Sequence, residues 1–156
     1  MTITKIMFWP IRIIKKLYDY ISGYLRIKYL SAYGIKIGRD TFISPKAYFD
    51  KAKPNMISVG DNCMITRGCM ILCHSDAKMG GKRKLWGNRE YGKVKIGNNV
   101  FLGVDTVVMP GVTIGDNVII GAKSLVLKDI PSNCVAFGIP AKKIKNLDDV
   151  IKRRKK

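Results

Sequence analysis

Aliphatic residues recur at every sixth position through the second half of the chain, with polar and small residues between them. The unbroken series is Ile96, Leu102, Val108, Ile114, Ile120 and Val126. Smaller or branched residues lie four positions after each of these, at Val100, Thr106, Val112, Val118, Ser124 and Ile130. An α-helix cannot keep such a stripe on one face, because six steps of about 100° end far from a full turn. Short strands separated by tight corners can, so the spacing predicts one strand and one corner for every six residues.

Two similar segments show what the corners contain. Residues 94–103 read VKIGNNVFLG and residues 112–121 read VTIGDNVIIG. Glycine, Asn and Asp are the residues that tolerate the positive φ of tight corners. The segments start 18 residues apart, which is three units, so we expect three strands per coil. The predicted fold class is all-β, a parallel β-helix of hexapeptide repeats whose coils bury one apolar column. A meander of ordinary strands is the alternative.

The same phase extends upstream of this region. Val59, Ile65 and Ile71 keep it, and Ile37 and Ile43 open it. The β-helix is therefore expected to begin well before the clearest repeats.

The pattern divides the chain into three segments. We expect an amphipathic helical segment over 1–32, which either caps the open end of the coil or contacts a membrane surface. The β-helix is expected over 33–145, with a break near 51–55 and an irregular excursion at 76–93. Residues 146–156 are expected to form a basic helix or tail.

Charge narrows the choice of partners. The 156 residues carry a formal net charge of +18, which favours nucleic acid, acidic lipid or phosphorylated ligands. Most of it lies in residues 1–36 (seven basic, one acidic), 76–93 (six basic, two acidic) and 142–156 (eight basic, two acidic). No nucleic-acid reading motif accompanies these clusters, so we expect no specific nucleic-acid partner. We expect an anionic or membrane-proximal acceptor, with contact to an anionic membrane surface.

Neither a secretory signal nor an apolar run long enough to span a bilayer is recognisable. The four cysteines form no CxxC pair and are expected to be reduced thiols. The expected location is the cytoplasm, free or associated with the inner face of the membrane.

Candidate chemistry centres on the only histidine, His74, which lies where the repeat ends and the excursion begins. The register places His74 outward, whereas Cys73 faces the core. An imidazole titrates near pH ~6.5 and can accept and return a proton. Asp50 and Asp76 are candidates for orienting it, and a backbone carbonyl is the third. One histidine is too few for the three-histidine zinc site of coil-shaped carbonic anhydrases, so no metal is expected.

From Val94 to Lys145, and at GDNCMI (60–65), the sequence resembles the hexapeptide-repeat acyltransferases with a left-handed β-helix. It is most similar to the galactoside and maltose O-acetyltransferase branch and its relatives in surface-polysaccharide biosynthesis. The resemblance implies a left-handed coil, acetyl-CoA as cosubstrate, and direct transfer to a sugar or glycan-precursor hydroxyl with His74 as general base. Two features depart from the galactoside enzymes: the segment after His74 is longer, and Ser75 replaces the usual proline.

The resemblance also implies binding residues and an assembly. The positions matched to coenzyme A contacts are Val104, Ala122, Leu127, Lys128, Lys142 and Lys145. Arg83, Trp86 and Tyr91 of the excursion are the expected acceptor contacts, within a homotrimer whose sites lie between subunits. Three alternatives stay open: another small acyl group, a non-sugar acceptor such as an amino acid or antibiotic, and a non-enzymatic module that binds nucleic acid or membrane.

Overall fold

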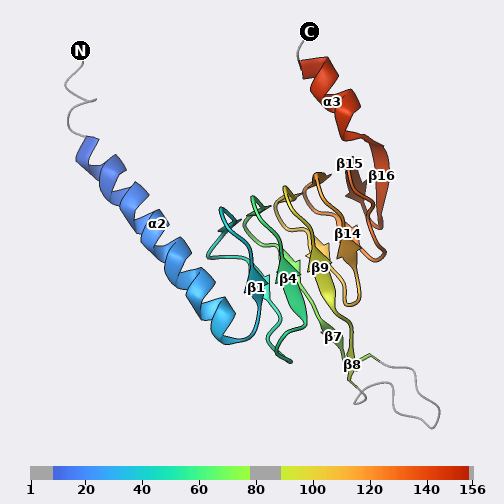
Figure 1. The fold of residues 1–156 in the computed structure, drawn as a ribbon, viewed down its shortest axis with the longest axis horizontal. Helices are drawn as coiled ribbons and strands as arrows, with labels where there is room; N and C mark the ends of the chain where they lie inside the picture. Colours follow the sequence, from blue (N-terminus) through green and yellow to red (C-terminus); the bar gives the residue numbers. More distant parts are fainter. Residues whose placement is uncertain (1–8, 78–88, 155–156) are drawn as a thin grey trace.

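The computed structural model describes residues 9–77 and 89–154 (Figure 1). A long helix, α2 (Trp9–Ala32), precedes a three-sided coil of short strands, and a hairpin and a short helix, α3 (Leu147–Arg154), follow it. Within the described ranges, no helix combines the length and apolar character needed to cross a bilayer.

Three mostly parallel sheets form the sides of the coil. Side A contains β1 (Lys36–Ile37), β4 (Ile57–Val59), β9 (Val94–Ile96) and β12 (Thr113–Ile114). Side B contains β2 (Phe42–Ile43), β5 (Met64–Ile65), β10 (Phe101–Leu102), β13 (Val118–Ile120), β15 (Cys134–Gly138) and β16 (Ala141–Asn146). Side C contains β3 (Tyr48–Phe49), β6 (Met70–Ile71), β11 (Val107–Val108) and β14 (Leu125–Val126). The chain visits sides A, B and C in turn, as three strands per coil require.

The predicted apolar column is the core of the coil. All six residues of the aliphatic series are buried, and so are all six residues of the smaller series. Thr106 and Ser124 are the polar members, and each hydroxyl donates to the Gly121 carbonyl, at 3.2 and 2.6 Å. The hexapeptide interpretation of the sequence is therefore confirmed, and the ordinary meander is excluded by the parallel pairing.

The register between coils locates every irregularity at one corner. In the regular coils Ile96 pairs with Ile114, 18 residues away. The first two coils pair Phe49 with Ile71, which is 22 residues and so 4 more than the repeat. The next pair joins Ile71 to Val108, which is 37 residues and so 19 more. Both insertions follow a side C strand and precede a side A strand, so they stack on the same corner.

A second corner shows why the sequence repeats Asn. Five residues adopt the left-handed conformation there, with φ between 53° and 58°: Asp40, Asn62, Asn99, Asn117 and Asn133. The Asn99 amide donates to Asn117 Oδ1 at 3.0 Å, and the Asn117 amide donates to Asn133 Oδ1 at 2.9 Å. The predicted positive-φ corner is confirmed, and its side chains form a ladder along the coil.

The coil ends differently from the sequence expectation, which continued it to residue 145. β15 pairs in parallel with β13 as a coil strand does, but β16 returns antiparallel to β15. This hairpin covers the last side B strand with its own backbone, so a side C strand does not follow. Residues 147–154 form α3, and the final two residues of the basic tail lie outside the described range.

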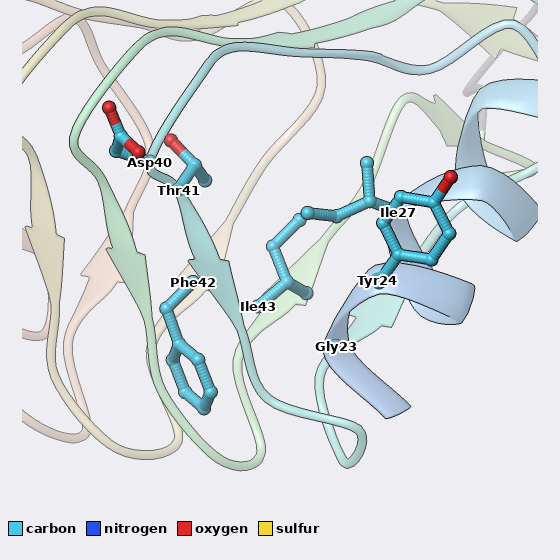
Figure 2. Close-up of a pocket in the computed structure, with 7 residues that line it drawn as sticks. All are labelled: Gly23, Tyr24, Ile27, Asp40, Thr41, Phe42 and Ile43. Atoms are coloured by element: carbon cyan, nitrogen blue, oxygen red, sulfur yellow. The ribbon is translucent and has the colours of Figure 1, made fainter. Parts of the chain in front are cut away.

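Helix α2 meets the coil only through its C-terminal turns and extends away from it (Figure 1). Leu30 is buried against the first coil, and the Arg26 guanidinium donates to the Ala47 carbonyl. Further along the helix, a groove of about 320 Å³ separates residues 23–27 from residues 40–43. Figure 2 shows Ile27 and Ile43 pointing toward each other across this groove. The helix thus covers only a small part of the open end of the coil.

The close stacking of corners gives a stability test at Gly97. A Cβ there would lie 2.4 Å from Asp116 Oδ1 and 2.8 Å from the Gly115 carbonyl carbon. We expect Gly97→Ala to lower the free energy of unfolding by about 2 kcal/mol or more, because backbone must move. Gly23→Ala is the control, since its Cβ would meet nothing within 4 Å and Ala favours helix by about 1 kcal/mol. Denaturant unfolding measures both; a stable Gly97→Ala protein would contradict this view of the corner.

Candidate active site

His74 lies on the corner where both insertions stack. It forms β7 (His74–Ser75), which pairs antiparallel with β8 (Glu90–Tyr91), so the base of the excursion is an ordered two-stranded ribbon. The His74 side chain is 23% exposed, whereas Cys73 is fully buried. The alternation predicted from the sequence therefore holds: the imidazole faces outward and the thiol faces the core.

Asp50 approaches His74 from the preceding coil. Its carboxylate is only 2% exposed, and Oδ2 is hydrogen-bonded to His74 Nδ1. The same oxygen accepts the backbone N–H groups of Cys73 at 3.0 Å and His74 at 3.1 Å. Oδ1 accepts the N–H of Ala52 at 2.9 Å. Four donors thus hold one buried carboxylate in a single orientation.

These contacts keep Asp50 ionised. Burial raises the pKa of the carboxyl, but the N–H groups of Ala52 and Cys73 and the imidazole of His74 outweigh it and leave the pKa below its ordinary value. An ionised Asp50 can only accept a hydrogen bond, so the proton of the neutral imidazole lies on Nδ1. Nε2 then carries the lone pair and faces outward as an acceptor.

Asp76 lies on the other side of the imidazole. Its Oδ2 is 3.8 Å from His74 Nε2, too far for a hydrogen bond. Arg89 donates to Asp76 through Nε at 2.7 Å and Nη2 at 3.2 Å. The paired guanidinium lowers the pKa of Asp76, so a second carboxylate stays ionised beside the reactive nitrogen. It is placed to stabilise an imidazolium when one forms.

Of the three residues expected to contact the acceptor, the structure describes Tyr91. Its ring centroid lies 6.1 Å from that of His74, and the Lys53 ammonium lies 5.1 Å from the centre of the Tyr91 ring. Arg83 and Trp86 lie outside the described residues. Tyr91 therefore places an aromatic ring near His74, and Lys53 places a basic side chain on that ring.

Asp50, Cys73 and His74 are close enough to suggest a metal centre, with ligand atoms within 4.8 Å of one another. Their chemistry does not fit one. Asp50 already accepts four hydrogen-bond donors, and burial raises the pKa of Cys73 to about 11, which keeps the thiol protonated. A protonated thiol is neither a good metal ligand nor a nucleophile. The cluster is better described as a carboxylate–imidazole pair over a buried thiol.

The positions matched to coenzyme A are spread over two corners of the coil and the final hairpin. Val104 and Ala122 stack on the corner between sides B and C, where the Lys123 N–H donates to the Val104 carbonyl at 2.7 Å. Leu127 and Lys128 are exposed after β14. Lys142 and Lys145 are exposed on β16, opposite Phe137 and Val135. The structure brings Asp50 and Asp76 to His74, but it places Val104 and Ala122 on a different corner.

Two residues near His74 were not predicted from the sequence. Arg89 is one of six basic residues in the excursion, and nothing in its spacing distinguishes it from the others. Lys53 belongs to the four-residue insertion of the first coil, which read only as a break in the repeat. The signal that could have identified Lys53 is that both insertions lie at the same corner of the coil, which follows from the register between coils.

Comparison with known proteins agrees with this architecture. Residues 93–128 match the family described as "Bacterial transferase hexapeptide (six repeats)". Protein CapG of Staphylococcus aureus is 37% identical over 116 residues, which cover 74% of this chain and 67% of CapG. The maltose O-acetyltransferase from Clostridium difficile 630 superposes with a TM-score of 0.65 at 38% identity, over 74% of this chain and 60% of that one. A galactoside acetyltransferase in complex with coenzyme A gives 0.63 at 30% identity, over 75% and 67%.

A three-sided parallel coil with one outward histidine at an inserted corner is the architecture of an acyltransferase built from hexapeptide repeats. The chain belongs to the hexapeptide-repeat acyltransferase family, and within it is related to sugar O-acetyltransferases. This confirms the resemblance inferred from the sequence and implies a left-handed coil. The chain spans 60–67% of the length of these three relatives.

The pairing of Asp50 with four donors gives a pH-dependent test. The folded-state pKa lies below the ordinary value of 3.8, so the ionised carboxylate stabilises the fold above that pH. The contribution is lost as the pH falls through the lower folded-state pKa. We expect Asp50→Asn to lower the free energy of unfolding by about 1–3 kcal/mol at neutral pH, and the deficit to shrink below pH ~4.

Asp40→Asn is the matched control, because Asp40 is exposed and Asn also tolerates its φ of 53°. It should change the unfolding free energy by less than about 0.5 kcal/mol. Chemical denaturation at several pH values measures both variants. An Asp50→Asn deficit that stays constant into acid would refute the ionised state.

Proposed function

We propose that this protein is an acetyl-CoA-dependent O-acetyltransferase that acts on a sugar or glycan-precursor hydroxyl. The observation that carries the proposal is the orientation of His74: Nδ1 is held by buried Asp50, and Nε2 lies on the opposite side of the ring, toward the exposed Asp76. The family relationship supplies the acyl-transfer class. The names of two relatives, a maltose and a galactoside acetyltransferase, favour a sugar acceptor.

His74 is assigned the role of general base in direct transfer. Nε2 accepts the hydroxyl proton as the acceptor oxygen attacks the thioester carbonyl, and the imidazolium returns that proton to the departing thiolate. Asp50 fixes the tautomer and supports the positive charge from one side. Asp76, which stays ionised through its direct contact with Arg89, supports the charge from the other side. No acyl-enzyme is required, and the protonated Cys73 is unsuited to form one.

The acyl donor is assigned to the corner between sides B and C. Val104 and Ala122 would lie along the pantetheine arm, with Leu127 and Lys128 near it and Lys142 and Lys145 as cationic contacts for the nucleotide phosphates. In one chain, β11 separates this corner from the corner that carries His74. Bringing the two corners together requires two copies of the chain.

The outward faces of the coil support such an assembly. Side A presents Lys36, Ser58, Lys95 and Thr113 in register. Side B presents Phe42, Met64 and Phe101, and side C presents Tyr48 and Met70, all between 37% and 48% exposed. Contact between two different apolar faces is heterologous, and a heterologous contact that closes produces a ring. We assign a homotrimer in which side B of one copy packs on side C of the next.

Removal of the imidazole tests the catalytic assignment. We expect His74→Ala to slow thiol release from acetyl-CoA with sugar acceptors by about 10²–10⁴-fold, because a positioned general base contributes that factor. Cys73→Ala is the matched control at the neighbouring residue and should retain most of the rate. Full activity in His74→Ala, or equal loss in both variants, would refute the base assignment. A thiol-trapping assay with product mass measurement also identifies the acceptor.

An unfavourable charge on side B tests the assembly. We expect Met64→Lys to reduce the mass measured by light scattering from three chains toward one, because the charge would be buried in the interface. Thr113→Lys places the same side chain on polar side A and should leave the mass unchanged. An active wild-type monomer at assay concentration would contradict the homotrimer.

A further inference from the structure

Helix α2 presents its apolar face away from the coil. Leu30 and Ile27 face the first coil, and Arg26 is held there by the Ala47 carbonyl. At 100° per residue, the opposite face of the helix is formed by Ile21, Leu25 and Lys28, with Tyr24 and Tyr29 at its edges. The exposed fractions are 47% for Ile21, 59% for Leu25, 54% for Tyr24 and 43% for Tyr29. A helix that served only to cap the coil would turn this face inward.

The composition of this face is that of an interfacial helix. The Lys28 ammonium lies 5.3 Å from the centre of the Tyr24 ring. The Lys51 ammonium lies over the Tyr33 ring and donates a hydrogen bond of 2.6 Å to the Tyr29 hydroxyl. Tyrosine and lysine combine an apolar body with a polar tip, which suits them to the boundary between hydrocarbon and water. Leucine and isoleucine between them supply the apolar area.

Charge is segregated onto this end of the molecule. Residues 94–141, which form the second half of the coil, contain three basic and three acidic residues, whereas residues 33–75 of the first half contain six basic and three acidic residues. Helix α2 contains five basic residues and one acidic residue. Two copies of such a helix repel each other at close approach, whereas an anionic lipid surface attracts both.

We propose that α2 docks the protein on an anionic phospholipid surface, with its axis along the plane of that surface. Ile21 and Leu25 insert among the upper acyl chains, and Tyr24 and Tyr29 lie at the headgroup level with Lys28. The groove between residues 23–27 and residues 40–43 lies on the coil side of the helix, opposite Ile21 and Leu25 (Figure 2). This inference is independent of the proposed reaction, because no residue of the docking face contacts His74, Asp50 or Asp76.

Residues 50–53 connect the docking face to the residues around His74. Asp50 binds His74, Lys51 binds Tyr29 of the helix, and Lys53 lies over Tyr91. A surface that contacts the C-terminal turns of α2 therefore lies beside the corner that carries His74. This arrangement suits an acceptor that is presented at a membrane.

Vesicle sedimentation tests the docking. The probes are vesicles of phosphatidylcholine containing phosphatidylglycerol, and vesicles of phosphatidylcholine alone. We expect the wild-type protein to prefer the anionic vesicles and to bind them less as salt rises. Ile21→Ser with Leu25→Ser should weaken binding about tenfold or more, because two apolar side chains no longer leave water. Lys28→Glu should weaken it about fivefold or more.

Matched controls carry the same changes elsewhere. Ile144→Ser removes an exposed apolar side chain from β16, and Lys95→Glu reverses an exposed charge on side A. Both should bind like the wild type, and circular dichroism should show that all variants are folded. Equal weakening by test and control variants would overturn the proposal. So would unchanged vesicle binding with a reduced mass in light scattering, which would mean that a second copy covers the face.

Discussion

The parallel stacking of coils in one register is the interaction on which the rest of the structure depends. Each coil strand before β15 contributes only two or three residues to a side, so none of them is stable without its neighbours above and below. The backbone bonds run from coil to coil, as from Gly60 N to the Ile96 carbonyl at 2.9 Å and from Gly97 N to the Ile114 carbonyl at 2.8 Å. The register fixes which side chains enter the core and how closely the corners approach. It explains both the strict six-residue spacing and the glycines at close contacts.

The same constraint determines where extra residues can be placed. An insertion within a strand would move the following side chains out of the column, whereas an insertion at a corner leaves the register intact. Both insertions lie on the corner between sides C and A, and stacking brings Asp50 of one beside His74 of the other. Asp50 accepts the backbone N–H groups of Cys73 and His74 at this corner. It also accepts a hydrogen bond from the imidazole of His74. One carboxylate therefore satisfies a structural need and orients the histidine.

The inward positions of the coil could be predicted from the sequence, because burial on a repeating geometry selects residue type at every sixth position. The positive-φ corners at Asn99 and Asn117 could be predicted for a similar reason, since few residues tolerate that conformation. Asp50 and Asp76 could be named as candidates, but the choice between them needed the register, which depends on insertion lengths. Arg89 could not be identified, because a salt bridge at a loop base leaves no periodic signal. The antiparallel return of β16 was missed because its residues, AKKIKN, show no periodic spacing from which a strand direction could be predicted.

The three sides of the coil share one inward pattern and differ in their outward residues. The core requires the same branched side chains on each side, so the inward positions carry little information about partners. Outward positions are free of that requirement. There side A is polar and sides B and C are apolar, and 20 of the 29 basic residues lie in residues 1–32, 76–93 and 142–156. A coil that only had to remain soluble would spread its charge over all three sides. We propose that this segregation reflects contacts, with the apolar sides facing copies of the chain and the basic segments facing anionic ligands. On a fold this repetitive, the specific features of the protein lie in its outward residues and in the residues that interrupt the repeat.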